Sequence, residues 1–189
     1  MLRNLVNEFR THCIDQNLEI NNNQIRVINN LEKYYHSNFK SFLNKIFNKS
    51  KLKQGFYLFG DVGVGKTMIL NFFFDKIKQK KIKLHFNEFM LNFHDFVHKR
   101  LNENEESVIN LFVKNLKSKF SLIYFDEFQV TNIVDAMILG KLFEQIFHQD
   151  IKIIVTSNTR IADLYKDGLQ RDQFKPFIKT MLIKSLEHE

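Results

Sequence analysis

The 189 residues, of which 44% are hydrophobic and 26% charged, have the composition of one globular domain with a substantial core. Cys13 is the only cysteine, which excludes a framework of internal disulfides, and no apolar run approaches the length of a membrane-spanning helix. The net charge of +7 would suit a polyanionic partner, but Lys, Asn, Ile and Phe are abundant along the whole chain, so we do not predict binding to nucleic acid. With no secretory signal at the N-terminus, these features predict a soluble intracellular protein.

The first 50 residues are predicted to form a helical segment in front of a main domain that comprises residues 51–189. Apolar residues recur there at helical spacing, namely Ile20, Ile25, Val27, Ile28, Leu31, Phe39, Phe42, Leu43 and Ile46. The run Asn21–Asn23 favours a turn or a helix cap, because Asn side chains accept hydrogen bonds from nearby backbone amides. A basic connector, Lys49–Lys53, would lead into the first strand.

A glycine-rich loop, Gly60–Thr67 with the sequence GDVGVGKT, is the strongest signal in the chain. It fits the G-x-x-x-x-G-K-[ST] pattern of a phosphate-binding loop. The run Gly55–Phe59 before it is typical of a buried strand, and Met68–Phe74 after it predicts a helix whose last turns carry lysines as far as Lys81. This order of strand, loop and helix is the context that the motif requires, and it favours a nucleotide phosphate site over a structural glycine turn.

Each part of the loop has a chemical reason to be there. The glycines allow positive φ and bring backbone N–H groups close to phosphate oxygens, and the helix that follows directs its partial positive charge at the same anion. Lys66 would reach the β- and γ-phosphates of ATP, and the Thr67 hydroxyl would bind Mg²⁺. The predicted nucleotide-binding residues are Gly60, Asp61, Val62, Gly63, Val64, Gly65, Lys66, Thr67 and Met68.

The next segment is predicted to contain one strand and two helices. Ile82–Phe86 alternates between polar and apolar residues, which predicts a half-exposed strand. Leu91–Leu101 and Val108–Lys119 are predicted helices, and the acidic stretch Asn102–Ser107 between them is predicted to be a loop.

The second informative sequence signal is the run Ser121–Glu127, in which four apolar residues precede two carboxylates. Such a run suits a central parallel strand, and its end is the place where open α/β sheets bind ligands. Asp126 would hold Mg²⁺, directly or through water. Glu127 would orient or deprotonate the attacking water, because phosphoryl transfer to water needs a positioned base. An Asp-Glu pair alone is a weak signal, but it is a strong one about sixty residues after a phosphate-binding loop.

The last third of the chain adds two candidate site residues. Val134–His148 is a predicted helix, and Ile151–Val155 a predicted strand that ends near Asn158. Asn158 would contact the γ-phosphate or the water, the alternative being an Asn that caps a loop. Arg171 could act as an arginine finger from a neighbouring subunit or form an ordinary surface salt bridge, and its residue type does not decide between the two.

Longer strings of residues resemble a known family, the AAA+ ATPases of the ZapE type and their mitochondrial relatives, the lactation-elevated (AFG-like) proteins. The matching strings are GDVGVGKTM at 60–68, LHFNEFM at 84–90 with His94 following, FDEFQVTNIVDAMIL at 125–139, TSN at 156–158 and DLYKDGLQRDQFKPFI at 163–178. The resemblance covers about residues 18–178. It implies a P-loop α/β core with a mainly parallel sheet between helices, and ATP hydrolysis with Mg²⁺.

The resemblance also implies roles for single residues. Lys66 and Thr67 would belong to Walker A and Asp126 and Glu127 to Walker B, while Asn158 would be sensor 1 and Arg171 the finger. Hydrolysis would drive the remodelling of a protein substrate or of a division-machinery partner, in the bacterial cytoplasm or at the membrane periphery. A homo-oligomeric ring is implied where a lid domain is present.

The sequence departs from the family in two places, so the resemblance supports nucleotide binding but does not settle turnover. Ile161 and Ala162 stand where the family usually has proline, and the sequence stops at Glu189, where family members continue into a helical lid. Two alternatives therefore stay open. One is a lidless nucleotide-dependent binding module with little turnover, and the other is a helicase-loader-like ATPase that acts on nucleic acid.

Overall fold

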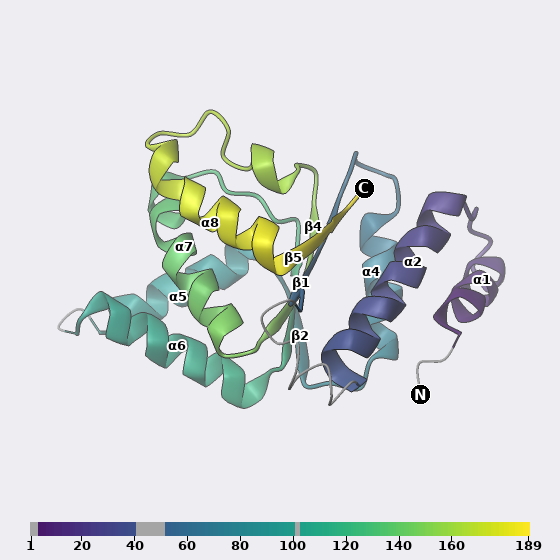
Figure 1. Ribbon diagram of the computed structural model, residues 1–189, viewed down its shortest axis with the longest axis horizontal. Coiled ribbons are helices and arrows are strands. Elements are labelled where there is room, and N and C mark those ends of the chain that lie inside the picture. The colour runs from purple at the N-terminus through teal and green to yellow at the C-terminus, as the bar shows by residue number, and fades with distance from the viewer. Residues whose placement is uncertain (1–3, 41–51, 101–102) are drawn as a thin grey trace.

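The computed structural model describes residues 4–40, 52–100 and 103–189, and within them the chain builds a parallel β-sheet between two layers of helices (Figure 1). The sheet has five strands in the order β2-β3-β4-β1-β5. Their bounds are Gly55–Phe59 for β1, Lys81–His85 for β2, Leu122–Asp126 for β3, Lys152–Ser157 for β4 and Ser185–His188 for β5. Each pair of neighbouring strands runs parallel, as predicted.

The two faces of the sheet are covered by different parts of the chain (Figure 1). On one face lie α5 (Phe86–His98), α6 (Glu105–Lys119), α7 (Ile133–His148) and α8 (Arg171–Lys184). On the other face lie α1 (Leu5–Asp15), α2 (Asn22–Tyr35) and α4 (Lys66–Lys76). The short π-helical turn η1 (His36–Lys40) follows α2, and the 3₁₀ turn η2 (Ile161–Asp163) follows β4. No helix of the described residues combines the length and the apolar character needed to cross a bilayer.

Successive side chains of a central strand point to opposite faces of the sheet, which explains why the core has one apolar cluster on each face. Ile123 and Phe125 of β3 pack into the cluster under α5 to α8, whereas Tyr124 between them packs against the α4 side. Phe125 is fully buried among aromatic rings, with the centroid of the Phe89 ring at 4.8 Å. Because both faces of β3 are covered, its apolar run continues without polar interruption until Asp126.

The N-terminal helices belong to the same core as the sheet. The predicted cap is confirmed: Asn21 forms a reciprocal capping box with Gln24 at the start of α2. The ring of Phe9 in α1 lies edge-on against Phe72 of α4, with centroids 5.1 Å apart. The buried hydroxyl of Tyr34 donates to the backbone carbonyl of Gln54, at 2.7 Å, and thereby joins α2 to the segment that enters β1.

We expect Tyr34→Phe to lower the free energy of unfolding by about 1–2 kcal/mol, because the change removes a buried hydroxyl that donates to the backbone carbonyl of Gln54 and lies 3.2 Å from that of Ile153, while the ring keeps its packing. Urea denaturation followed by circular dichroism would measure this. Tyr165→Phe is the matched control, since the structure shows no hydrogen bond for the Tyr165 hydroxyl, and it should change stability by less than about 0.5 kcal/mol. Equal stabilities of the two variants would contradict the expectation.

Several predicted boundaries were wrong. The helix after the glycine loop ends at Lys76, so Lys78 and Lys80 lie in a loop and Lys81 begins β2. The buried Ile77 has extended φ and ψ there, and the Lys81 ammonium group binds the carbonyls of Phe74 and Ile77, which a longer helix would have used. Cations therefore do stabilise this helix end, but from the following strand.

The other corrections concern the bounds of α5 and α6. α5 begins at Phe86, directly after β2, and five residues earlier than predicted, because Phe86, Phe89 and Met90 form its buried face. α6 begins at Glu105, since the Asn104 side chain caps it. α5 also ends at His98, earlier than the predicted end at Leu101. The positions Phe42, Leu43 and Ile46, most of the connector Lys49–Lys53 and the proposed boundary at residue 50 lie outside the described residues.

Candidate nucleotide site

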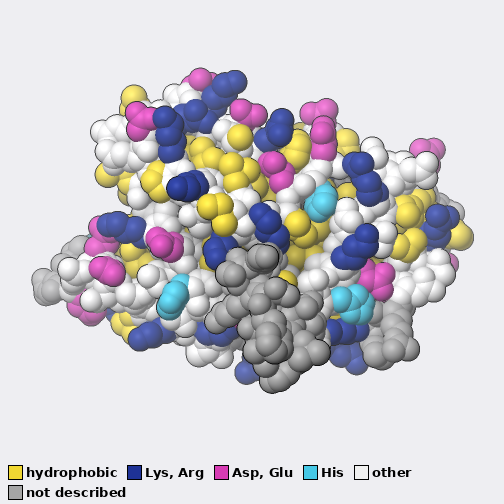
Figure 2. Space-filling model, in the orientation of Figure 1, with side chains coloured by type: hydrophobic (Ala, Val, Ile, Leu, Met, Phe, Trp, Pro, Cys, Tyr) yellow, Lys and Arg dark blue, Asp and Glu magenta, His cyan; other side chains and the backbone are white. Residues whose placement is uncertain are grey.

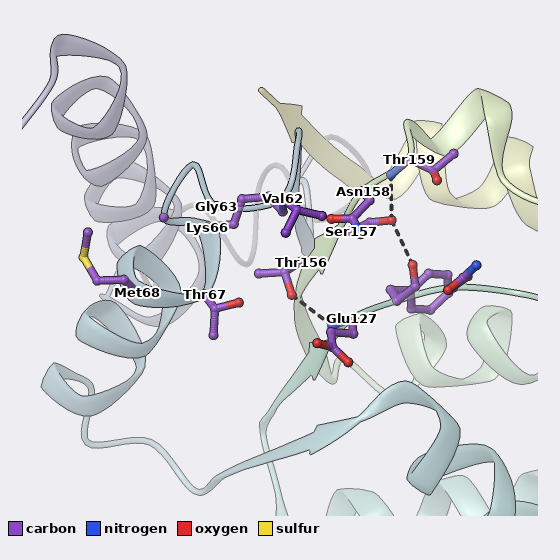
Figure 3. Close-up of a pocket in the computed structure, with 13 residues that line it drawn as sticks. Val62, Gly63, Lys66, Thr67, Met68, Glu127, Thr156, Ser157, Asn158 and Thr159 are labelled. Carbon is purple, nitrogen blue, oxygen red and sulfur yellow. Dashed lines mark hydrogen bonds between the residues drawn. The ribbon is translucent and has the colours of Figure 1, made fainter.

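A cavity of about 530 Å³ opens at the carboxyl ends of the parallel strands, where the glycine loop, β3 and β4 meet. It is lined by Val62, Gly63 and Gly65–Met68 from the loop and the start of α4, and by residues 127–129 and 156–159. Figure 3 shows Thr67, Thr156 and Glu127, which come from three different elements, around this one space. The structure thus brings together most of the predicted site residues.

The glycine loop adopts the backbone that its sequence predicts. Gly63 and Gly65 have φ of 87° and 90°, in the left-handed region that favours glycine. Gly65 is the N-cap of α4, and a Cβ atom at this position would lie 3.2 Å from the Gln24 amide nitrogen. The free N–H groups of the first turn of α4 therefore lie directly behind the loop, which suits an anion.

The remaining loop residues divide between solvent and core. Asp61, Val62 and Val64 are exposed, and the Val62 side chain is 83% accessible. Met68 lines the cavity and also packs, partly buried, against the cluster of the N-terminal helices.

Lys66 is buried, and its ammonium group is held by three oxygens. It donates to the carbonyls of Gly60 and Asp61, at 2.8 and 2.7 Å, and to Asn158 Oδ1 at 3.1 Å. Burial lowers the pKa of Lys66, and the nearby charge of Asp61 opposes that effect. The Lys66 N–H groups that would bind a phosphate now donate to these three oxygens. An incoming phosphate would therefore displace the three oxygens.

Asp126 is buried at the end of β3 and accepts several hydrogen bonds. Its Oδ1 atom lies 3.2 Å from the Thr67 hydroxyl and 2.5 Å from the Thr156 hydroxyl, and Oδ2 lies 2.9 Å from the ammonium nitrogen of Lys83. Burial raises the pKa of Asp126, but the Thr156 hydroxyl and Lys83 outweigh it and hold this pKa below its ordinary value. Asp126 is therefore an ionised carboxylate next to a threonine hydroxyl at neutral pH.

Glu127 differs from Asp126 in both exposure and backbone. Its side chain is 79% accessible, and its φ of 54° is in the left-handed region, which is uncommon for a residue other than glycine. The Thr156 hydroxyl accepts the Glu127 backbone N–H at 3.0 Å and so stabilises this turn. The carboxylate consequently stands in the open cavity, with His85 Nδ1 at 3.5 Å (Figure 3).

Arg171 is a predicted site residue that does not line the cavity. It begins α8, and its guanidinium group donates to the carbonyl of Ala162 at 2.8 Å. Ala162 lies in η2. Within one copy of the described residues, Arg171 thus holds a loop and does not face the site.

Sequence reasoning missed four side chains around the two carboxylates, one of which is Tyr124, whose hydroxyl donates to Asp126 Oδ1 at 3.1 Å. Thr156 binds both Asp126 and the backbone of Glu127, and Lys83 and His85 reach these two carboxylates from β2. The signal for Lys83 and His85 was present, since residues two apart on a strand share a face. Thr156 stands in the TSN string, where only its Asn was singled out.

The donor atoms suit magnesium when a nucleotide supplies the other ligands. Among the described residues no group of three His, Cys, Asp or Glu side chains converges as a metal site would require. The Thr67 hydroxyl and the Asp126 carboxylate offer hard oxygen donors next to the phosphate loop. Mg²⁺ is usually held by one or two protein oxygens together with phosphates and water, so these residues fit it.

A second cavity, of about 310 Å³, lies on the other side of the loop, between α2 and the end of β1. Its lining includes Asn23, Gln24 and Arg26 from α2, Leu58 and Asp61 from the strand and loop, and Lys66, which lines the first cavity too. The two cavities therefore meet at the phosphate loop.

The sheet, the glycine loop before α4 and the acid at the end of β3 define a P-loop α/β fold. Within it, the chain belongs to the AFG1-like ATPase family, whose model matches residues 10–186. Lactation elevated protein 1 homolog B of Danio rerio is 38% identical over 152 residues, which cover 75% of this chain and 30% of that protein. The cell division protein ZapE of Escherichia coli K12 is 36% identical over 128 residues, 66% of this chain and 33% of ZapE. The chain spans about a third of the length of these relatives.

Solved structures share the fold at low sequence identity. The DnaI structure superposes with a TM-score of 0.59 at 16% identity and covers 92% of this chain and 88% of its own. The DnaC helicase loader has a TM-score of 0.56 at 14% identity, covering 90% of this chain and 92% of its own. AMPPCP-bound DnaA from Aquifex aeolicus has a TM-score of 0.53 at 17% identity over 92% of this chain and 49% of its own.

Proposed function

We propose that this chain binds ATP with Mg²⁺ and hydrolyses it, and that hydrolysis drives the remodelling of a protein partner. The observation that carries the proposal is that Lys66, Thr67, Glu127 and Asn158, from three separate parts of the chain, line one cavity, and that Asp126 lies within hydrogen-bond distance of Thr67. Membership of the AFG1-like ATPase family supports the same activity.

Each of these residues would have its own role in nucleotide binding or hydrolysis. The loop amides and Lys66 bind the β- and γ-phosphates, and Thr67 and Asp126 hold Mg²⁺. The metal ion, when bound, neutralises charge on the transferring phosphoryl group. Glu127 orients or deprotonates the attacking water from its exposed position, and Asn158, which contacts Lys66, responds to the γ-phosphate. The second cavity, beyond the loop, would receive the nucleoside.

Partner, assembly and location form the broader part of the proposal. A division-machinery partner is supported by the name of the cell division protein ZapE, and a protein substrate and a cytoplasmic site of action are proposed along with it. Because Arg171 does not face the cavity of its own chain, it could complete a site only on a neighbouring copy in a ring. We do not propose a nucleic-acid partner: on the face seen in Figure 2, Lys and Arg side chains are interspersed with acidic ones.

The position of Arg171 also favours a second candidate, a binding module that holds ATP with little turnover. Titration with a fluorescent ATP analogue, together with phosphate release at several protein concentrations, separates the two. Release that is Mg²⁺-dependent and rises steeply with protein concentration supports an assembled ATPase. Tight binding with background release supports the binding module, and no binding at all would overturn both.

Thr156→Val is expected to reduce phosphate release at least tenfold, because the lost hydroxyl positions Asp126 through its carboxylate and Glu127 through its backbone N–H. The affinity for the ATP analogue should stay within about threefold, because this hydroxyl contacts no residue of the phosphate loop. Valine keeps the shape of threonine, so the fold should survive. Thr159→Val makes the same change on the same cavity at a hydroxyl for which the structure shows no hydrogen bond, and should retain activity. Similar release rates of the two variants would count against this role of Thr156.

A further inference from the structure

Lys83, on the edge strand β2, makes an unusual set of contacts. Its ammonium nitrogen lies 2.9 Å from Asp126 Oδ2 and 2.8 Å from Asn71 Oδ1, and 5.0 Å from the centre of the Tyr124 ring. Strand register explains this reach, since Lys83 pairs with Tyr124 and the next residue pair on the same side is His85 with Asp126. The lysine stem therefore crosses the Tyr124 ring and ends at the carboxylate.

This arrangement differs from that of an ordinary lysine on an edge strand. Lysines at such edges usually extend into water, where their charge discourages pairing with other strands. The side chain of Lys83 is only 33% accessible, and the Asp126 side chain that it contacts is 6% accessible. Because the Asp126 partner is buried, water screens this ion pair less than a pair between two exposed side chains.

The two oxygens of Asp126 have separate partners. Oδ1 lies within hydrogen-bond distance of the hydroxyls of Thr67, Tyr124 and Thr156, whereas Lys83 binds Oδ2. One carboxylate oxygen has about two lone pairs for hydrogen bonds, so three hydroxyls exceed its capacity. Thr67 is the most distant of the three, at 3.2 Å, and its oxygen is the one most easily turned toward a metal ion.

α4 contributes to both sides of this arrangement. Thr67 contacts Oδ1 directly, and Asn71, one helical turn later, accepts a hydrogen bond from Lys83. The helix that begins at the phosphate loop thus orients the Asp126 carboxylate at both oxygens, once through a hydroxyl and once through the Lys83 ammonium group.

We propose that Lys83 is a positioning residue for the magnesium site: it fixes the Asp126 carboxylate with Oδ1 toward Thr67 and offsets its charge, so that a divalent cation binds only together with the nucleotide. With Lys83 in place, the charge of the Asp126 carboxylate is offset by an ammonium group at 2.9 Å before any nucleotide binds. The phosphates of the nucleotide then supply the negative charge that a divalent ion needs. This inference rests on the proposed Mg²⁺-dependent nucleotide site and adds a determinant of when the metal enters.

The test uses the full chain and Mn²⁺ as the probe, with free Mn²⁺ measured by electron paramagnetic resonance in the absence of nucleotide. Lys83→Met removes the charge and keeps an apolar stem on the Tyr124 ring. We expect this variant to bind Mn²⁺ roughly tenfold more tightly than the unchanged protein, because a cation a few ångströms from the carboxylate has been removed. Lys83→Arg keeps the charge and should bind Mn²⁺ as weakly as the unchanged protein does.

Lys78→Met is the matched control, since Lys78 is an exposed lysine in the loop before β2 for which the structure shows no partner, and it should leave Mn²⁺ affinity unchanged. Phosphate release adds a second readout: in Lys83→Met, kcat should fall several-fold while KM for ATP stays within about threefold, because the loop that binds phosphate is intact.

The outcomes separate the inference from the function beneath it. If the unchanged protein binds Mg²⁺ with nucleotide but Lys83→Met and Lys78→Met bind Mn²⁺ equally, the role of Lys83 is overturned and the nucleotide site stands. If the unchanged protein binds no Mg²⁺-nucleotide, the proposed function and this inference both fail.

Discussion

Lys66→Ala is expected to weaken the binding of Mg²⁺·ATP by roughly 100-fold or more and to reduce phosphate release to background. The ammonium group of Lys66 is the buried cation of the loop, and its three present partners are neutral oxygens that a phosphate can replace. A charge-assisted bond to an anion is stronger than the bonds that it replaces, and alanine offers neither. Titration with a fluorescent ATP analogue and a phosphate-release assay would measure both effects.

Two comparisons make the Lys66 result interpretable. Lys78→Ala removes an exposed lysine outside the cavity. This variant should bind the ATP analogue and release phosphate as the unchanged protein does. A thermal unfolding curve of Lys66→Ala checks the fold, because the carbonyls of Gly60 and Asp61 lose their donor. A folded Lys66→Ala protein that still bound the analogue with unchanged affinity would refute the proposed phosphate site.

Glu127→Gln should lower phosphate release by roughly 10²–10³-fold and leave analogue affinity within about threefold. Glutamine has nearly the same shape, and the Glu127 side chain is largely exposed, so the change removes a base without altering the core. The backbone N–H bond to Thr156, which sets the turn, is also preserved. Single-turnover measurements at saturating ATP would isolate the chemical step.

Glu88→Gln makes the same change at an exposed glutamate of α5 that does not line the cavity, and it should have no effect. Turnover of Glu127→Gln at the unchanged rate would mean that another group activates the water. His85, which lies 3.5 Å from the Glu127 carboxylate, would then be the first residue to examine.

The parallel sheet and the position of its ligand-binding edge could be predicted from the sequence because both depend on local patterns. The apolar run before Asp126 and the glycines before Lys66 each determine their own strand or loop. Once parallel strands are inferred, their carboxyl ends must lie at one edge, so Thr67, Asp126 and Asn158 were expected near each other. The hydrogen bonds from Thr67 to Asp126 and from Lys66 to Asn158 agree with that expectation.

The contacts that could not be predicted depend on register between strands. Lys83 reaches Asp126 only because β2 pairs with β3 so that Lys83 lies opposite Tyr124, and no local pattern determines that offset. The start of α5 at Phe86 was missed for a related reason. A strand followed at once by a helix has no turn residues to mark the boundary, and the alternating pattern runs into the helical one.

The N-terminal helices have a practical consequence for the choice of an expression boundary. A deletion series that began after α2 would keep the glycine loop and both Walker segments intact. It would, however, expose Ile69, Leu70 and Phe73 on α4, which are now buried in one cluster with α1 and α2. The aggregation of such a shortened chain would therefore report the loss of this cover and say nothing about the nucleotide site.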